Sequence, residues 1–327
     1  MHTLSGGTFV RQKAIIETVF EMDTPVTLSH PREGIDGSLY VCSHGGEILK
    51  FTDEGEYGVF KTLGGMPNCI AIKKATPEQN EEQQPQDQQQ QQQSQEQGED
   101  IYIADISNCM VYEKKYNAEL GVFFKSYESL PLKGPSSLIL NQKENYLLVS
   151  DSGHFGSTSL NNPNGSLFHI DLETSMCKPI LLNCLAYPSD IFYDESTDMI
   201  YICETYRNRV LRIAQNPLGI FHCSVFHTFN GRVGPTAIAI DEVGNIYVSR
   251  YEFQHSKNEV DGIISILNKE GNEIGELVVP GKSEINGMLI PRNKNTSNIM
   301  YFTVKNGNGV WRIKLSQLAA EIDKMQG

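Results

Sequence analysis

Apolar residues in this chain gather in short runs separated by polar turns, and over most of its length they do not recur at helical spacing. Typical stretches are "GSLYVCSHGGEILKF" from Gly37, "EDIYIADISNCMVYE" from Glu99 and "MIYICETYRNRVLRI" from Met199. The runs are rich in β-branched and aromatic residues and the turns in Gly, Asp and Asn, which is typical of strand–turn–strand units. The pattern therefore predicts an all-β protein.

The strand–turn–strand unit repeats along the chain. Before nearly every copy comes a second signature, a Pro or Ile followed by a small polar residue and an apolar run, as in "MPNCIAI" and "GPTAIAI". Short strands without covering helices can hide their faces and edges by radial packing. We therefore predict a single six-bladed β-propeller over residues 1–327. Its anchors recur about every 40–55 residues once one insertion is set aside: Tyr40, Tyr102, Leu148, Tyr201, Tyr247 and Tyr301.

The sequence predicts a different structure for each end of the chain. The N-terminal run "TFVRQKAIIETVF" is a strand without a repeat of its own, and we expect it to pair with the last repeat and close the ring. The C-terminal "LSQLAAEIDKM" has helical spacing, so residues 316–327 are predicted to form a short helix or tail.

Residues 75–100 interrupt the second repeat with a Gln- and Glu-rich, polyglutamine-like segment. The segment has no aromatic or branched aliphatic residue and is predicted to be a disordered surface loop. It holds seven acidic residues and no base, so the rest of the chain carries only −6 of the net charge of −13. With no basic cluster to neutralise phosphates, nucleic-acid binding is excluded as a function.

Targeting signals are missing from the sequence as it stands. The first residues contain no apolar signal-peptide core, and no run approaches the ~18 apolar residues that span a bilayer. We therefore expect a cytoplasmic protein with no membrane span. The seven cysteines are scattered without a CxxC pair and most lie in apolar runs, which favours reduced thiols.

The stretches "VSDSGHFGSTSLNNPNGSLFHIDLETS", "MIYICETYRNRVLRI" and "GIISILNKEGNEIGEL" resemble the regucalcin/gluconolactonase and strictosidine synthase-like superfamily of six-bladed propellers, with NHL-repeat propellers close by pattern. The resemblance implies a site at one tunnel mouth, built from the starts of innermost strands and the ends of second strands. Residues matched to these positions are Asn68, Ser136, Ser189, Asp190, Thr236 and Asn286, then Asp105, Asp151, His154, Glu204 and Arg250.

Lactonase-like members of the superfamily bind a divalent cation, often calcium, which needs several hard oxygen ligands. The resemblance makes Glu33, Asn68, Asp190 and Asn286 the metal candidates, with Glu33 the loosest because the first repeat looks compressed. Thr236 stands where the family has aspartate, so the metal set looks degenerate. Asn286 stands where strictosidine synthases have a catalytic Glu, and an amide cannot act as general base.

Two further groups could act at the mouth. An Asp151–His154 pair could activate water for attack on a lactone or ester, although a solvent-exposed loop histidine is the simpler interpretation. Glu204 follows a strand and is expected to bind turn amides. With Ser136, Ser189, Thr236 and Arg250, it completes the set of candidate ligand-binding residues.

Three functions remain open at this point. The first is a binding propeller that holds a small molecule or a partner protein at the tunnel mouth. The second is a divalent-metal (calcium) dependent hydrolase of the lactonase or arylesterase type. The third is an NHL-like scaffold in a protein assembly. Whether the protein is an enzyme is therefore an open question, because fold alone does not decide it.

Overall fold

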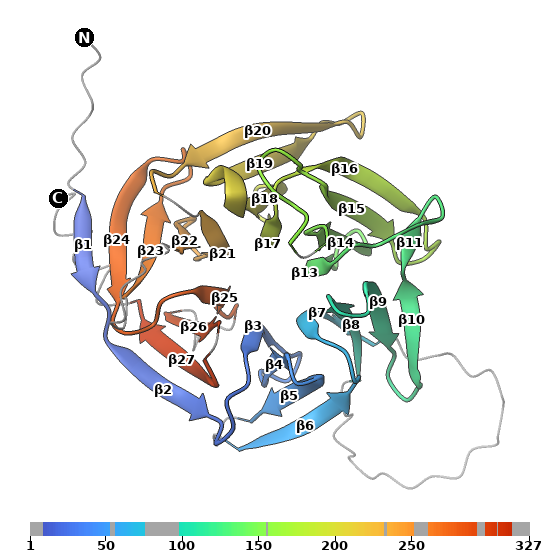
Figure 1. The fold of residues 1–327 in the computed structure, drawn as a ribbon, viewed down its shortest axis with the longest axis horizontal. Coiled ribbons are helices and arrows are strands. Elements are labelled where there is room, and N and C mark those ends of the chain that lie inside the picture. Colours follow the sequence, from blue (N-terminus) through green and yellow to red (C-terminus); the bar gives the residue numbers. More distant parts are fainter. Residues whose placement is uncertain are drawn as a thin grey trace, which may run out of the picture.

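The computed structural model describes residues 9–52, 56–75, 98–154, 156–231, 234–251, 261–292, 298–305 and 307–315. Within these residues the chain is all-β, and the one helix is the short 3₁₀ turn η1 (Thr205–Arg207). Six blades, five of four strands and one of five, surround a central axis (Figure 1). This confirms the six-bladed propeller. The glutamine-rich segment between Lys74 and Glu99 and the predicted C-terminal helix lie largely or wholly outside the described residues.

Each blade is an antiparallel sheet whose first strand lies innermost. The strands, blade by blade and from the axis outward, are β3 (Leu28–Glu33), β4 (Leu39–Ser43), β5 (Glu47–Phe51) and β6 (Tyr57–Thr62); β7 (Pro67–Lys74), β8 (Glu99–Asp105), β9 (Met110–Lys114) and β10 (Leu120–Phe124); β13 (Pro135–Asn141), β14 (Tyr146–Asp151), β15 (Gly165–Asp171) and β16 (Cys177–Leu185); β17 (Pro188–Asp194), β18 (Met199–Glu204), β19 (Arg209–Gln215) and β20 (Phe221–Thr228); β21 (Pro235–Ile240), β22 (Ile246–Arg250), β23 (Gly262–Leu267) and β24 (Glu273–Val279); β25 (Ile285–Leu289), β26 (Ile299–Val304) and β27 (Gly309–Lys314), with β2 outermost. A small hairpin of β11 (Ser126–Tyr127) and β12 (Leu130–Pro131) connects blades two and three.

The N-terminal segment contributes two strands rather than the single one expected. β2 (Ile16–Glu21) pairs antiparallel with β27 and is the fourth strand of blade six. β1 (Val10–Lys13) pairs in parallel with β24, which gives blade five a fifth strand. The segment thus joins two neighbouring blades and brings β2 against β27, the last described strand (Figure 1).

The core is divided into six apolar clusters, one in each interface between neighbouring blades. The anchor tyrosines of the repeats lie in these interfaces. Tyr40, for example, is fully buried with Ile70 and Ile103 between blades one and two. Each blade therefore buries both faces against its neighbours, which is why a closed ring suits strands of this kind. Of the cysteines, Cys42, Cys69 and Cys203 are buried, whereas Cys184 and Cys223 are exposed free thiols.

Inner strands carry a β-bulge near their start. In blades two to six the register shifts between the first and third residues, so the second residue is left out of the ladder. In blade one the shift falls between Ser29 and Arg32, and His30 has the left-handed φ of 45°. β3 is a full six-residue strand, so the first blade is not compressed as the sequence suggested. A bulge redirects a side chain, here at the mouth of the tunnel.

Gly287 makes room for the bulge of blade one, and this gives a testable expectation. A Cβ at Gly287 would lie 2.4 Å from the backbone nitrogen of His30, whereas a Cβ at Gly121 has no neighbour within 4 Å. We expect Gly287→Ala to destabilise the protein by about 1–3 kcal/mol through overpacking, and Gly121→Ala to leave stability unchanged or raised. Urea unfolding of both variants measures this, and equal behaviour would contradict the close approach.

Candidate functional site

A closed belt of hydrogen bonds surrounds one mouth of the tunnel. Near the start of each inner strand, one side chain donates to a backbone carbonyl of the following blade, and the sixth donates back to the first. The donors and acceptors are Ser29 Oγ to Asn68 O (2.9 Å), Asn68 Nδ2 to Ser136 O (2.6 Å), Ser136 Oγ to Pro188 O (2.8 Å), Ser189 Oγ to Pro235 O (3.2 Å), Thr236 Oγ1 to Ile285 O (2.6 Å) and Asn286 Nδ2 to Leu28 O (3.0 Å).

The belt gathers residues that sequence analysis placed at the mouth. Five of them lie around the axis as expected, and each donates a hydrogen bond to the neighbouring blade: Asn68, Ser136, Ser189, Thr236 and Asn286. Small polar residues suit this position because their short side chains reach a carbonyl of the adjacent inner strand without filling the opening. Sequence analysis missed the sixth member, Ser29, although "LSHP" repeats the small polar residue that follows an apolar or Pro position in the other blades.

Carboxylates at the ends of second strands hold the segments that enter their blades. Asp105 Oδ1 accepts the backbone N–H of Met66 at 3.0 Å, and Asp151 Oδ2 accepts that of Lys133 at 2.8 Å. Glu204 Oε1 accepts the N–H of Ala186 at 2.7 Å. The same contact in three blades is the turn-amide role expected for Glu204.

The environment of Glu204 also fits a structural role. Its side chain is fully buried and forms ion pairs with Arg207 Nη1 at 2.9 Å and Arg209 Nε at 2.6 Å. Both carboxylate oxygens are thus occupied by cations or a backbone amide. Arg250, at the equivalent position of blade five, instead pairs with Glu276 at 2.8 Å and lies over the ring of Phe229.

The proposed Asp151–His154 pair is not assembled in this structure. Asp151 is buried, and its Oδ1 accepts the backbone N–H of Gly153 at 3.0 Å while Oδ2 holds Lys133. Burial raises the pKa of this carboxyl, against the opposing effect of those backbone hydrogen bonds. His154 is exposed, and in the described part of the chain no side-chain hydrogen bond joins it to Asp151.

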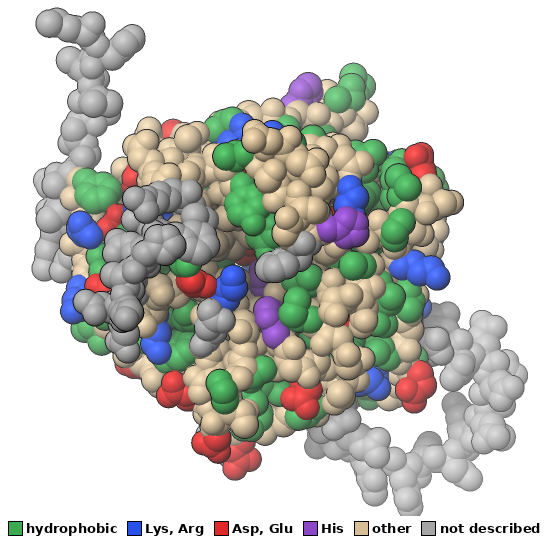
Figure 2. All heavy atoms as spheres, in the orientation of Figure 1, with side chains coloured by type: hydrophobic (Ala, Val, Ile, Leu, Met, Phe, Trp, Pro, Cys, Tyr) green, Lys and Arg blue, Asp and Glu red, His purple; other side chains and the backbone are tan. Residues whose placement is uncertain are grey.

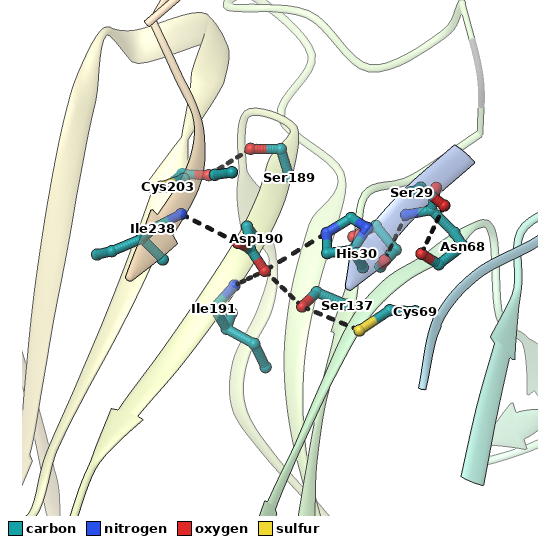
Figure 3. A network of polar contacts seen from close by, with 12 residues as sticks. Ser29, His30, Asn68, Cys69, Ser137, Ser189, Asp190, Ile191, Cys203 and Ile238 are labelled. Atoms are coloured by element: carbon teal, nitrogen blue, oxygen red, sulfur yellow. Dashed lines mark hydrogen bonds and ion pairs between the residues drawn. The ribbon is translucent and has the colours of Figure 1, made fainter. Parts of the chain in front are cut away.

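A second polar network lies one residue further along the inner strands than the belt (Figure 3). Its centre is Asp190, which is only 1% exposed. Asp190 Oδ1 accepts hydrogen bonds from Ser137 Oγ at 2.7 Å and from the backbone N–H of Ile191 at 2.9 Å. Its Oδ2 accepts the backbone N–H of Ile238 at 3.1 Å. Figure 3 shows His30 pointing toward the same carboxylate, with Cys69 beside Ser137. Residues from four blades thus meet on one buried charge.

Two basic side chains of blade one face Asp190, and sequence analysis did not identify either of them. His30 Nε2 lies 3.5 Å and Arg32 Nη2 lies 3.9 Å from Asp190 Oδ1. Burial raises the pKa of Asp190, but His30, Arg32 and the Ser137 hydroxyl together hold it below its usual value. The carboxylate is therefore charged and compensated inside the tunnel.

His44 adds a half-buried imidazole to the belt side of the tunnel. Its Nε2 lies 3.0 Å from Asn68 Oδ1, and burial lowers its pKa although the Asn68 contact opposes this. Figure 2 shows histidine side chains near the centre of the viewed face. Amide, hydroxyl and imidazole groups therefore surround the mouth. A hydroxyl that donates to the next blade keeps acceptor lone pairs, and a donating side-chain amide has a second N–H, so these groups suit an uncharged polar molecule.

The four candidate metal ligands do not form a calcium site. Glu33 lies at the other end of β3, where its Oε2 accepts the backbone N–H of Arg292 at 2.9 Å. Asn68 Oδ1 is engaged by His44, Asn286 Oδ1 accepts from Thr303 Oγ1 at 2.8 Å, and Asp190 is enclosed as described. In the described ranges, no three His, Cys, Asp or Glu side chains are grouped to hold a metal. The residues present do not fit calcium, which needs six to eight oxygens.

Comparisons with known proteins give one consistent picture. No family model matches the chain. It is similar to lactonase drp35 of Staphylococcus aureus (28% identical) and of Staphylococcus haemolyticus (25% identical), in each case over 127 residues, or 38% of this chain. That match spans only 36% of the length of these curated relatives. The described residues include no helix long and apolar enough to cross a membrane.

Solved structures extend the similarity to nearly the whole chain. A gluconolactonase from Xanthomonas campestris superposes with a TM-score of 0.67 at 12% identity and covers 92% of this chain and 89% of its own. A luciferin-regenerating enzyme superposes with a TM-score of 0.68 at 12% identity, covering 92% and 95%. At these identities the likeness concerns the fold. The chain therefore has the six-bladed propeller fold of the gluconolactonase-like proteins, with partial sequence similarity to lactonase drp35.

Proposed function

We propose that this protein is a binding propeller that holds an uncharged, polar small molecule at the belt side of its tunnel. One observation carries the proposal: the amides and hydroxyls that meet at the mouth are bonded to neighbouring blades, and its one central carboxylate is enclosed. The mouth therefore has fixed hydrogen-bonding groups, whereas the carboxylate at its centre is not exposed as a metal ligand would need to be.

A hydrolase of lactonase or arylesterase type is the second candidate, and the match to lactonase drp35 favours it. In this case a divalent metal such as calcium would be required, and the ligands named above would need to rearrange to reach it. The two candidates therefore differ in one measurable property, the response to metal.

We expect calcium and a chelator to leave the thermal unfolding midpoint of the purified protein unchanged. A metal at 100 times its Kd stabilises the native state by about 2.7 kcal/mol, which is easily detected. An absent shift together with no turnover of a lactone and phenyl-ester panel supports the binding propeller. A calcium-dependent stabilisation with turnover would overturn it in favour of the hydrolase.

The small-molecule site is tested at His44. A panel of neutral lactones and sugars is screened by thermal shift, and a compound that stabilises the wild type is titrated into His44→Ala. We expect at least a tenfold loss of affinity in this variant and none in His222→Ala, because His222 lies on the outer strand β20. Equal binding to both variants would place the site elsewhere than the belt side, and the lack of any stabilising compound would contradict the proposed binding of a neutral lactone or sugar.

A further inference from the structure

The other end of the tunnel holds a cavity of about 290 Å³, lined from Arg32 and Glu33 of blade one to Arg292 of blade six. Its walls are the second halves of the inner strands, and they are mainly aliphatic. Ile139, Phe192, Ile240 and Leu289 line it and are only half-buried, so they present apolar surface to its interior. Concave, mostly apolar cavities with few polar groups are typical ligand sites.

Arg32 lies at the inner end of this cavity. Arg32 is one of the residues that line the cavity, and its side chain is 18% exposed. Nη1 donates to Pro31 O at 3.0 Å and Nη2 to Cys69 Sγ at 3.2 Å, which uses two of the five N–H donors of an arginine. Asp190 is 3.9 Å away and has three closer hydrogen-bond donors of its own. Arg32 therefore lines an apolar chamber with more N–H donors than these two contacts use, and its charge also faces the buried Asp190.

Charged side chains mark the outer opening of the cavity. Arg292 follows β25, the inner strand of blade six, and its Nη1 pairs with Glu195 Oε1, which follows the inner strand β17 of blade four, at 2.7 Å. Both side chains are largely exposed, with 63% and 42% of their surface accessible. Exposed ion pairs contribute little free energy and open readily. The pair can separate to admit a ligand.

We propose that this cavity binds a monocarboxylate with an unbranched apolar tail, with its carboxylate on Arg32 and its tail toward the Arg292–Glu195 pair. An arginine binds a carboxylate through two parallel N–H···O bonds, and aliphatic walls bind the methylenes. The volume corresponds to roughly ten water molecules at about 30 Å³ each, which suits a tail of about eight carbons. This site is separate from the belt-side mouth and from the function proposed there.

Isothermal titration calorimetry with octanoate and octan-1-ol tests the charge requirement. We expect octanoate to bind at one site per chain and at least tenfold more tightly than octan-1-ol. From hexanoate to octanoate each methylene should tighten binding about fourfold. Equal affinities for the acid and the alcohol, or an absence of octanoate binding, would overturn the proposal.

Two cavity variants locate the site. Leu289→Trp fills the chamber from its wall and should weaken octanoate binding at least tenfold, while Leu182→Trp, on the exposed outer strand β16, should bind like the wild type. Arg32→Gln should weaken octanoate but not octan-1-ol. Because Arg32→Gln could impair folding by leaving Asp190 less compensated, Leu289→Trp decides the location. Wild-type binding by Leu289→Trp would refute it, whatever the outcome at the belt-side mouth.

Discussion

Asp190→Ala should lower the free energy of unfolding by about 3–5 kcal/mol, the range measured when one partner of a buried ion pair is removed. The substitution leaves Arg32 and His30 in the tunnel without their carboxylate, and removes the acceptor of Ser137 Oγ and of the Ile238 amide. Urea unfolding monitored by the fluorescence of the single tryptophan, Trp311, measures the change.

Asp194→Ala is the matched control, because it lies at the other end of the same strand. The Asp194 carboxylate accepts hydrogen bonds from the exposed residues Ser196 and Thr197, so its loss should cost about 1 kcal/mol. Asp190→Asn combined with Arg32→Gln should lose less stability than the sum of the two single variants, since the pair is coupled. Equal losses in Asp190→Ala and Asp194→Ala would show that the tunnel network contributes little.

Deleting residues 1–21 should destabilise the protein by about 5 kcal/mol and lower its melting temperature by roughly 7 °C. The deletion removes the fourth strand of blade six and the fifth strand of blade five. It uncovers the interface where Val10 and Ala14 are buried, and the one where Val19 and Phe20 pack against blade one. It also leaves β27 as an unpaired edge.

A peptide of residues 9–21 provides the test of this closure. Added to the truncated protein, it should restore part of the lost melting temperature, because it recreates both pairings. Glu21→Ala in the full chain, at an exposed position of β2, should melt like the wild type. An unchanged melting temperature of the truncated protein would mean that the ring does not depend on its N-terminal strands.

The sequence predicted the architecture well because repeats are visible in a single chain. Runs such as "GPTAIAI" mark the start of an inner strand in five blades, and the structure places their polar residues around one mouth. In blade one the signature is altered: the bulge lies one residue later, over His30 and Pro31. Because of this shift, the sequence pattern did not identify Ser29 as part of the belt, and it wrongly matched Glu33 to a metal ligand at the mouth.

The chemistry of the tunnel was harder to predict, because it depends on contacts between blades. Asp190 was singled out as a metal ligand, but its partners His30, Ser137 and Ile238 come from three other blades. No local pattern indicates that a histidine in one repeat will meet a carboxylate some 160 residues later. Side-chain pairing across a ring depends on bulge positions, which hydrophobic periodicity does not reveal.

The belt has a consequence for how the molecule can come apart. All six donors point the same way around the ring, so each blade both gives and receives one of these bonds. Detaching any single blade therefore breaks two of them and exposes two apolar interfaces at once. Because detaching any of the six blades carries this free-energy cost, we expect the protein to unfold cooperatively rather than blade by blade.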